Sequence, residues 1–248
     1  MIVKRMMASL KRQDWAMVAI EFALVVIGVL FAFQITEWAN EREAAQERAA
    51  ASERLLLEAE QTVAYVRLGL SAQKESTADL NYALDQMQRG TWPTADKDRM
   101  VRGLTTATVA LPLAPPSAVY DDLIASGGFG KFGDAQLRSV IAKYRATLDF
   151  HAVVIANFLQ IHPKLEEHEA FHYAFAPTGW QRVRLEVDFP ALARDGLLQE
   201  KLAQLADSQR VRMLITERAL KGATRMCLEL GRYVGRPCNL NLPPPTFD

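Results

Sequence analysis

Apolar side chains recur every three or four residues over a long stretch that begins at Ala45, with a mean period of about 3.5 residues. This spacing places one apolar stripe along a long helix, and Gly90 and Pro93 predict where that helix ends. The same register continues backward to Glu21, which predicts one continuous helix. The positions on the predicted stripe are Ala45, Ala49, Ser52, Leu56, Ala59, Val63, Val66, Leu70, Gln73, Thr77, Leu80, Leu84 and Met87.

Upstream of this stripe, residues 15–38 form an apolar run in which Glu21 is the one strongly polar side chain between Trp15 and Phe33. A helix of this length measures roughly 36 Å and exceeds the hydrocarbon core of a bilayer, which is about 30 Å thick. We therefore predict a transmembrane helix with the indoles of Trp15 and Trp38 at the two interfaces. A cleaved signal peptide is the alternative, although its apolar region is usually shorter and ends in a small-x-small site.

The charges around the apolar run predict the orientation of the chain. Basic residues precede the run and a negative balance follows it, so the positive-inside rule places the N-terminus in the cytoplasm. The basic residues are Lys4, Arg5, Lys11 and Arg12. We predict a cytoplasmic tail (1–14), a transmembrane helix (15–38), an external helical bundle (39–236) and a Pro-rich C-terminal tail (237–248). This arrangement is typical of a single-pass protein of the bacterial inner membrane with a periplasmic domain.

Glu21 is a costly residue inside a bilayer, because a carboxylate there must be protonated, paired or close to the headgroups. On a helix it shares one face with Gly28 and Ala32, whose small side chains permit close approach of another helix. Two interpretations stay open. Glu21 either faces a partner in a helix–helix interface, or it lies near the cytoplasmic headgroups.

Small residues continue on the same stripe beyond the membrane at Ala45 and Ala49, where they again allow two backbones to approach closely. We therefore expect homo-oligomerisation, or pairing with another envelope membrane protein, through the span and residues 38–52. Ala19 and Ala23 offer a competing small patch on the opposite face of the helix. The larger stripe residues farther along are expected to be covered within the chain.

The remainder of the chain predicts an all-α fold, in which three or four long helices form a bundle. Ser117 is expected to cap a short helix, and Asp134 a long one that runs toward Pro163 and resumes to Tyr173. Asp188 or Asp195 is expected to open the last helix. The other predicted segments are a loop over 91–116 with at most one edge strand, a short strand over 182–187, and the end of the last helix near Gly235 and Pro237.

The charge balance excludes one class of partner. The chain has 29 basic and 29 acidic residues, whereas a nucleic-acid binder needs a basic excess to neutralise phosphates. We therefore expect no nucleic-acid partner. The lipid bilayer and another membrane protein are the expected partners.

The two cysteines, Cys227 and Cys238, both fall in the predicted external domain. An oxidising periplasm permits them to form a disulfide, which would fasten the C-terminal tail to the last helix. The alternative is one buried thiol in the helix and one exposed thiol in the tail. We expect the disulfide.

The motif HEAFH at residues 168–172 is the sharpest candidate for chemistry. On a helix, His168 and His172 would point the same way and hold Zn²⁺, with Glu169 as the general base. Glu186, Asp188 and Asp195 are the candidates for the third ligand that such a site requires. The alternative, which we favour, is a solvated helix face without a cofactor, because Glu166 precedes the motif where zinc proteases have uncharged residues.

Two segments carry a resemblance to a known group of proteins. The residues EFALVVIGVLFAFQITEWANER (21–42) and SAVYDDLIASGGFGKFGDAQLRSVIAKYR (117–145) resemble an uncharacterised bacterial family of single-pass membrane proteins, a domain of unknown function. The resemblance rests on Trp38, Asn40 and Glu41 at the membrane exit, and on Tyr120, Leu123, Ser126, Gly127 and Leu137 in the second segment. It implies a membrane anchor and a helical external domain, and it implies no activity.

These observations favour an interaction or scaffold protein of the cell envelope without an assigned catalytic activity. The alternative is a membrane-tethered zinc hydrolase that uses the 168–172 motif. A ligand sensor is a third hypothesis, and it would need a partner for output because only a short tail precedes the span. The residues do not identify a substrate.

Overall fold

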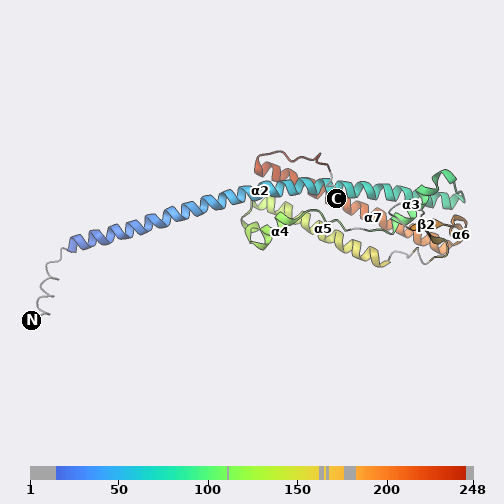
Figure 1. Ribbon diagram of the computed structural model, residues 1–248, viewed down its shortest axis with the longest axis horizontal. Helices are drawn as coiled ribbons and strands as arrows, with labels where there is room; N and C mark the ends of the chain where they lie inside the picture. The colour runs from blue at the N-terminus through green and yellow to red at the C-terminus, as the bar shows by residue number, and fades with distance from the viewer. Residues whose placement is uncertain (1–14, 111, 162–164, 166–167, 176–182, 244–248) are drawn as a thin grey trace, which may run out of the picture. The chain divides into compact units, whose positions relative to one another are not determined.

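The computed structural model describes residues 15–110, 112–161, 165, 168–175 and 183–243. The fold is mostly helical, as the sequence predicted, and three long helices dominate it (Figure 1). The predicted tail 1–14 and residues 244–248 lie outside the described residues. The elements in chain order are α2 (Trp15–Arg89), η1 (Thr94–Asp96), α3 (Lys97–Ala107), α4 (Ala118–Ala125), η2 (Gly128–Lys131), α5 (Ala135–Ile161), β1 (Phe171–Phe175), β2 (Val183–Val187), α6 (Phe189–Arg194) and α7 (Gly196–Val234).

The chain divides into two compact units, with the boundary between Ala51 and Ser52. In the first unit the described residues belong to α2, and every side chain described from Ile20 to Ala50 is exposed. This helix is long and apolar enough to cross a membrane, and its most apolar stretch of 18 residues has a mean hydropathy of 1.9. The predicted end of the transmembrane helix at residue 38 stays a prediction.

The second unit is a bundle in which α2, α5 and α7 pack around an apolar core. The predicted stripe on α2 faces this core from Ser52 to Met87, where its positions are buried or half-buried, and the prediction of a helical stripe is confirmed there. The first apolar cluster joins the beginning of this α2 segment to α5 and the end of α7. Its buried members include Leu55, Leu56, Ala59 and Val63 of α2, Leu137, Val140, Ile141, Tyr144 and Leu148 of α5, and Ala223, Met226, Cys227 and Leu230 of α7.

A second apolar cluster lies at the other end of the bundle and includes the small elements. There α3, α6 and the β1–β2 hairpin cover the ends of the long helices. Trp92 stacks on Phe189 with ring centroids 5.2 Å apart. The buried members include Leu80, Ala83 and Met87 of α2, Met100 and Leu104 of α3, Ile155 and Phe158 of α5, Phe171 of β1, Val187 of β2, Leu192 of α6, and Leu198, Leu202 and Leu205 of α7.

Two predictions for the loops and small elements were wrong. Residues 97–107 form α3, although we expected a loop over 91–116. Residues 171–175 form β1 instead of helix and pair antiparallel with β2, Phe171 opposite Val187. Phe171 and Val187, which lie opposite each other in this hairpin, are both buried in the second apolar cluster. The predicted strand over 182–187 is confirmed as β2 for residues 183–187.

A helix begins after each of the two predicted caps, Asp188 and Asp195. The carboxylate of Asp188 accepts a hydrogen bond from the Ala191 N–H and begins α6, while Asp195 accepts one from the Leu198 N–H and begins α7. The two alternatives that the sequence left open therefore describe two consecutive helices. Each carboxylate satisfies an N–H that a helix start leaves unpaired.

The cap of α4 comes from a residue far away in the sequence. We expected Ser117 to cap this helix, but its hydroxyl donates to Asp121 instead. The N–H groups of Val119 and Tyr120 donate to the carboxylate of Glu58 on α2. Burial raises the pKa of Glu58, while these two donors oppose the shift. A buried carboxylate thus fixes α4 on the surface of α2.

The C-terminal tail folds back onto the bundle. A disulfide joins Cys227 of α7 to Cys238, with Cα atoms 5.7 Å apart, so the tail is fastened to the last helix as the sequence predicted. Glu60 of α2, which is buried, accepts hydrogen bonds from the Arg236 guanidinium and the Asn239 N–H, at 2.9 and 2.8 Å. The first residues of the predicted tail, as far as Leu240, therefore pack against α2 and α7.

The close packing of α3 on α2 depends on a glycine. A Cβ on Gly103 would lie 2.4 Å from the backbone carbon and oxygen of Asp79. The two backbones therefore approach more closely than any side chain at position 103 permits. The contact lies within the second apolar cluster, because Leu104 and Leu80 are both fully buried there.

We predict that Gly103→Ala destabilises the protein by about 1–3 kcal/mol, since α3 must move away from α2. Chemical unfolding of the full chain in a non-ionic detergent measures this loss. The matched control is Gly69→Ala on α2, where the new methyl meets only a Leu113 methyl at 3.4 Å. That variant should be neutral or up to about 1 kcal/mol more stable, because alanine favours the helix. Equal stabilities for both variants would contradict the close approach.

Candidate functional site

A layer of polar side chains separates the two apolar clusters of the bundle. It consists of residues that the described structure buries in the middle of each long helix. On α7, Gln209, Arg212 and Thr216 are 3%, 3% and 0% exposed, and His151 of α5 is 1% exposed. Gln73 and Thr77 face the layer from α2, each with a buried oxygen that has no hydrogen-bond partner. Because buried polar groups are usually paired, this layer is an exception that needs an explanation.

Arg212 is the most unusual member of this layer. Its Nη1 donates to the Gln209 amide oxygen at 2.9 Å and to the Val109 carbonyl oxygen at 3.3 Å, while its Nε has no acceptor. The guanidinium also lies over the ring of Phe158, 4.7 Å from its centroid. None of these contacts supplies a negative charge. The cation is therefore held by neutral groups alone.

Burial lowers the pKa of Arg212 from its usual range to about 10, and among the described residues no acid opposes the shift. The unfolded chain binds this proton more tightly than the folded chain does. Folding therefore carries a penalty on the order of 3 kcal/mol at every pH below about 10, and the penalty is relieved only as the pH rises above about 10. The arginine opposes folding throughout the physiological range.

His151 of α5 is the second buried titratable group of the layer. Its Nε2 is 3.4 Å from the Thr216 hydroxyl, which donates to the Arg212 carbonyl oxygen, and its Nδ1 is buried without a partner. Burial and then the positive charge of Arg212 lower the pKa of His151. The imidazole is therefore neutral in the folded protein at neutral pH.

A cavity of about 420 Å³ adjoins this polar layer. Segments of α2, α3, α7 and the chain after α3 form its wall. Leu68, Ala72 and Pro112 in this wall are exposed, so solvent reaches the cavity. The polar residues of the wall are Tyr65, Gln73, Ser76, Thr106, Gln209 and Arg212; Leu68, Gly69, Ala72, Val109, Pro112 and Leu113 complete it.

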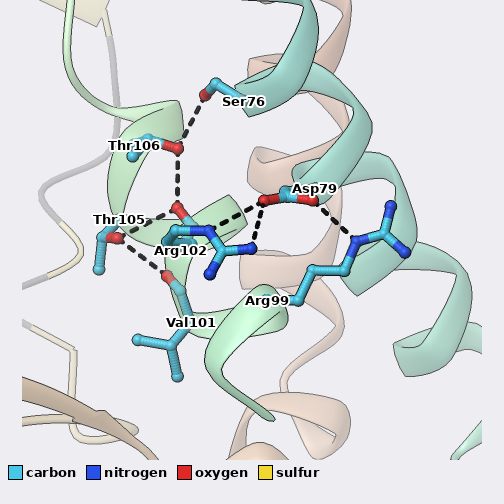
Figure 2. A network of polar contacts seen from close by, with 7 residues as sticks. All are labelled: Ser76, Asp79, Arg99, Val101, Arg102, Thr105 and Thr106. Atoms are coloured by element: carbon cyan, nitrogen blue, oxygen red, sulfur yellow. Dashed lines mark hydrogen bonds and ion pairs between the residues drawn. The ribbon is translucent and has the colours of Figure 1, made fainter. Parts of the chain in front are cut away.

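Figure 2 shows the network of polar contacts that includes Ser76 and Thr106, two residues of the cavity wall. The buried carboxylate of Asp79 on α2 accepts from Arg99 at 2.8 Å and from Arg102 at 3.2 Å, both on α3. One turn earlier on α2, Ser76 lies 2.8 Å from the Thr106 hydroxyl. Since the Thr106 hydroxyl donates its one proton to the Arg102 carbonyl, Ser76 is the donor of this bond. These contacts position Ser76 and Thr106 in the cavity wall.

The 168–172 motif does not form the helical arrangement that zinc binding would need. His168 and Glu169 lie in a turn, and His172 lies on β1, where it is exposed and opposite Glu186. The Nδ1 of His168 accepts from the Ala170 N–H at 3.1 Å, and its Nε2 is 2.7 Å from an Asp195 carboxylate oxygen. Both ring nitrogens are therefore engaged within the chain.

The three candidates for the third zinc ligand, Glu186, Asp188 and Asp195, have other surroundings in the structure. Asp195 contacts His168 as a hydrogen-bond partner and caps α7, so its pKa is lowered first by the Leu198 N–H and then by His168. Asp188 caps α6, and Glu186 is an exposed residue of β2. Within the described ranges no group of three His, Cys, Asp or Glu residues is close enough to hold a metal ion.

The predicted helix interface is exposed in the single chain. Glu21, Gly28, Ala32, Ala45 and Ala49 all lie on α2 before Ser52, and each is exposed. A Cβ on Gly28 would meet no other atom within 4 Å. This exposure leaves the face available to a partner, and the interface itself stays a prediction.

The sequence analysis did not identify the polar layer. Gln73 and Thr77 were assigned to the stripe, but Arg212 and His151 were not singled out. One signal was available, because Gln209 and Arg212 interrupt the apolar positions of α7 between Leu205 and Ile215 at helical spacing. A charged residue at a position that faces the core would have marked the site.

Comparison with known proteins adds no family or relative to these observations. No family model, curated protein or solved structure matches the chain. The resemblance to single-pass membrane proteins of unknown function therefore stays a prediction, and the candidate site rests on its geometry.

We predict that His151 makes the protein less stable in mild acid. The pKa of His151 in the folded protein lies below the unfolded value of about 6.5. Below pH 6.5 the unfolded chain therefore binds a proton that the folded chain binds less readily, and the stability present above that pH is progressively lost. The free energy of unfolding of the wild type should fall between pH 7 and pH 5. His151→Leu should reduce this slope by up to about 1.4 kcal/mol per pH unit, the value for one proton.

The control for this measurement is His172→Gln, which removes an exposed histidine of β1. Its pH dependence should match that of the wild type. If His151→Leu keeps the full wild-type slope, then the buried imidazole is not the group that titrates.

Proposed function

We propose that this protein is a single-pass protein of the bacterial inner membrane, anchored by the first part of α2. The observation that carries the proposal is the continuous apolar surface of α2 before the bundle. Large side chains there are exposed, for example Phe22 at 70%, Leu24 at 63% and Phe33 at 71%. Soluble proteins rarely expose apolar surface of this extent, whereas a bilayer accepts it.

Two further observations support an N-terminus in the cytoplasm and a periplasmic bundle. The basic residues before Trp15 and the acidic balance after Trp38 follow the positive-inside rule. The bond between Cys227 and Cys238 is a kind of crosslink that persists in oxidising compartments and is rare in the cytosol. The bundle on the C-terminal side of the anchor then lies in the periplasm.

The proposed activity is binding, and the first partner is a second copy of the chain. The stripe on α2 is covered by α5 and α7 from Ser52 onward, whereas Ala45 and Ala49 on the same stripe are exposed. Small residues on an uncovered stripe, together with Gly28 and Ala32 in the apolar segment, suit close pairing of two helices. Another envelope membrane protein is the alternative occupant of this face.

The orientation predicts the behaviour of reporter fusions. Alkaline phosphatase fused after Asp248 should be active, because the enzyme matures only outside the cytoplasm. A green fluorescent protein at the same point, exported in unfolded form, should be dark. The matched control is phosphatase fused within the N-terminal tail, after Ser9, which should be inactive. Phosphatase activity at Ser9 and none at Asp248 would reverse the orientation.

The proposed self-association predicts a pattern of crosslinks along α2. Single cysteines are introduced in a Cys227→Ser, Cys238→Ser background and oxidised in membranes. Gly28→Cys, Ala45→Cys and Ala49→Cys should give covalent dimers, and Val63→Cys and Val66→Cys should give few because both side chains are fully buried. Glu47→Cys, on the opposite helix face from Ala45 and Ala49, is the matched control and should also give few. Equal dimer yields at all six positions would contradict a specific face, and no dimers would indicate a different partner.

A further inference from the structure

The polar layer contains a positive charge that the described acidic residues do not neutralise. Elsewhere in the bundle, buried carboxylates are paired with arginines, Asp79 with Arg99 and Glu60 with Arg236. Arg212 instead donates from Nη1 to two neutral oxygens, and its Nε has no acceptor. Apolar packing does not require a guanidinium here, because a neutral side chain would avoid the desolvation cost.

We propose that the cavity beside Arg212 binds a small amphipathic carboxylate, with its anionic head on the guanidinium and its apolar body along the wall formed by α2 and Leu113. This binding activity goes beyond the membrane anchoring and self-association proposed above. Arginine suits a carboxylate because its planar donors match two oxygens, and a charge-assisted hydrogen bond is stronger than a neutral one.

Gln73 provides a second polar group for the head. Its Oε1 is buried without a partner and, like Arg212, the residue lines the cavity. The oxygen and nitrogen of a side-chain amide exchange places by a half-turn, so the buried end of Gln73 becomes a donor when an anion is present. The ligand thereby supplies hydrogen-bond partners to two buried side chains, Arg212 and Gln73, whose Nε and Oε1 have none within the chain.

The wall of the cavity defines the rest of the ligand. Leu68, Val109, Pro112 and Leu113 supply apolar surface, and the cavity volume of about 420 Å³ falls in the range of small-molecule sites. The polar members other than Arg212 are neutral, so one unit of negative charge balances the site. A phosphate dianion would leave charge uncompensated, and a sugar would find too few hydrogen-bond partners.

Calorimetric titration of the full-length protein in a non-ionic detergent tests the proposal with four probes. Octanoate and 4-phenylbutyrate carry the proposed head on an alkyl and an aryl body, and the stronger of the two identifies the body that the cavity prefers. Octan-1-ol has the alkyl body without the charge, and acetate has the head without the body. We expect at least one of the apolar carboxylates to bind at least tenfold more tightly than both octan-1-ol and acetate.

Two variants place the binding in this cavity. Arg212→Gln should weaken binding of the preferred carboxylate at least tenfold and leave the octan-1-ol signal unchanged. Gly69→Leu should block binding of both the carboxylate and octan-1-ol, because a Cβ at position 69 would already contact Leu113 in the cavity wall. The matched control is Arg218→Gln, which removes an exposed arginine of the same helix and should bind as the wild type does. Circular dichroism confirms that each variant is folded.

Several results would overturn the proposal. If octan-1-ol binds the wild type as tightly as the carboxylates do, then the charge of Arg212 plays no part in recognition. Equal carboxylate binding by the wild type and by folded Arg212→Gln would assign the signal to the micelle or the protein surface. Wild-type protein that binds none of the four probes would exclude this ligand class, and that outcome leaves the membrane anchor untouched, because the reporter fusions test it separately.

Discussion

The structure depends on the need of one helix to bury a long apolar stripe. The α2 stripe from Ser52 to Met87 is too extended for a single small core, and two long neighbours cover it: α5, which runs in the same direction as α2, and α7, which runs antiparallel to it. Side chains at 3.5-residue spacing stay on one face only when helices pack nearly parallel to each other. The small elements then close the ends of the bundle where the long helices leave apolar surface uncovered.

The packing at the two ends differs in kind. At the end near Ser52, carboxylates of α2 organise other segments: Glu58 caps α4, and Glu60 holds Arg236 and the disulfide-bonded tail. At the other end, Gly103 lets α3 contact the α2 backbone directly, and Asp79 pairs with two arginines. In both places a buried carboxylate is stabilised by several donors, which offsets the cost of removing its charge from water.

The sequence predicted the long elements because their information is periodic and local. The stripe on α2, the apolar positions of α5 and the disulfide between Cys227 and Cys238 are confirmed. The predictions failed where distant residues decide the structure. The 168–172 segment has a helical charge pattern, yet it forms a turn and a strand because β2 pairs with it. The N–H of Val119 in α4 donates to Glu58, 61 residues away in the sequence, and not to the nearby Ser117 that we expected as the cap. The candidate cavity belongs to the same class, because its wall combines residues of α2, α3 and α7 that no local pattern brings together.

The position of Arg212 explains how the bundle tolerates it. A buried cation that lowers stability on the order of 3 kcal/mol would endanger a small core. Here the arginine lies between two apolar clusters, so neither cluster loses a side chain of its own and each packs without a polar group at its centre. The cation–π contact with Phe158 and the hydrogen bond to Gln209 recover part of the cost, but both are weaker than a bond to a carboxylate. Since a neutral side chain at this position would fold more stably, stability alone does not account for the arginine, and an anion in the adjoining cavity does.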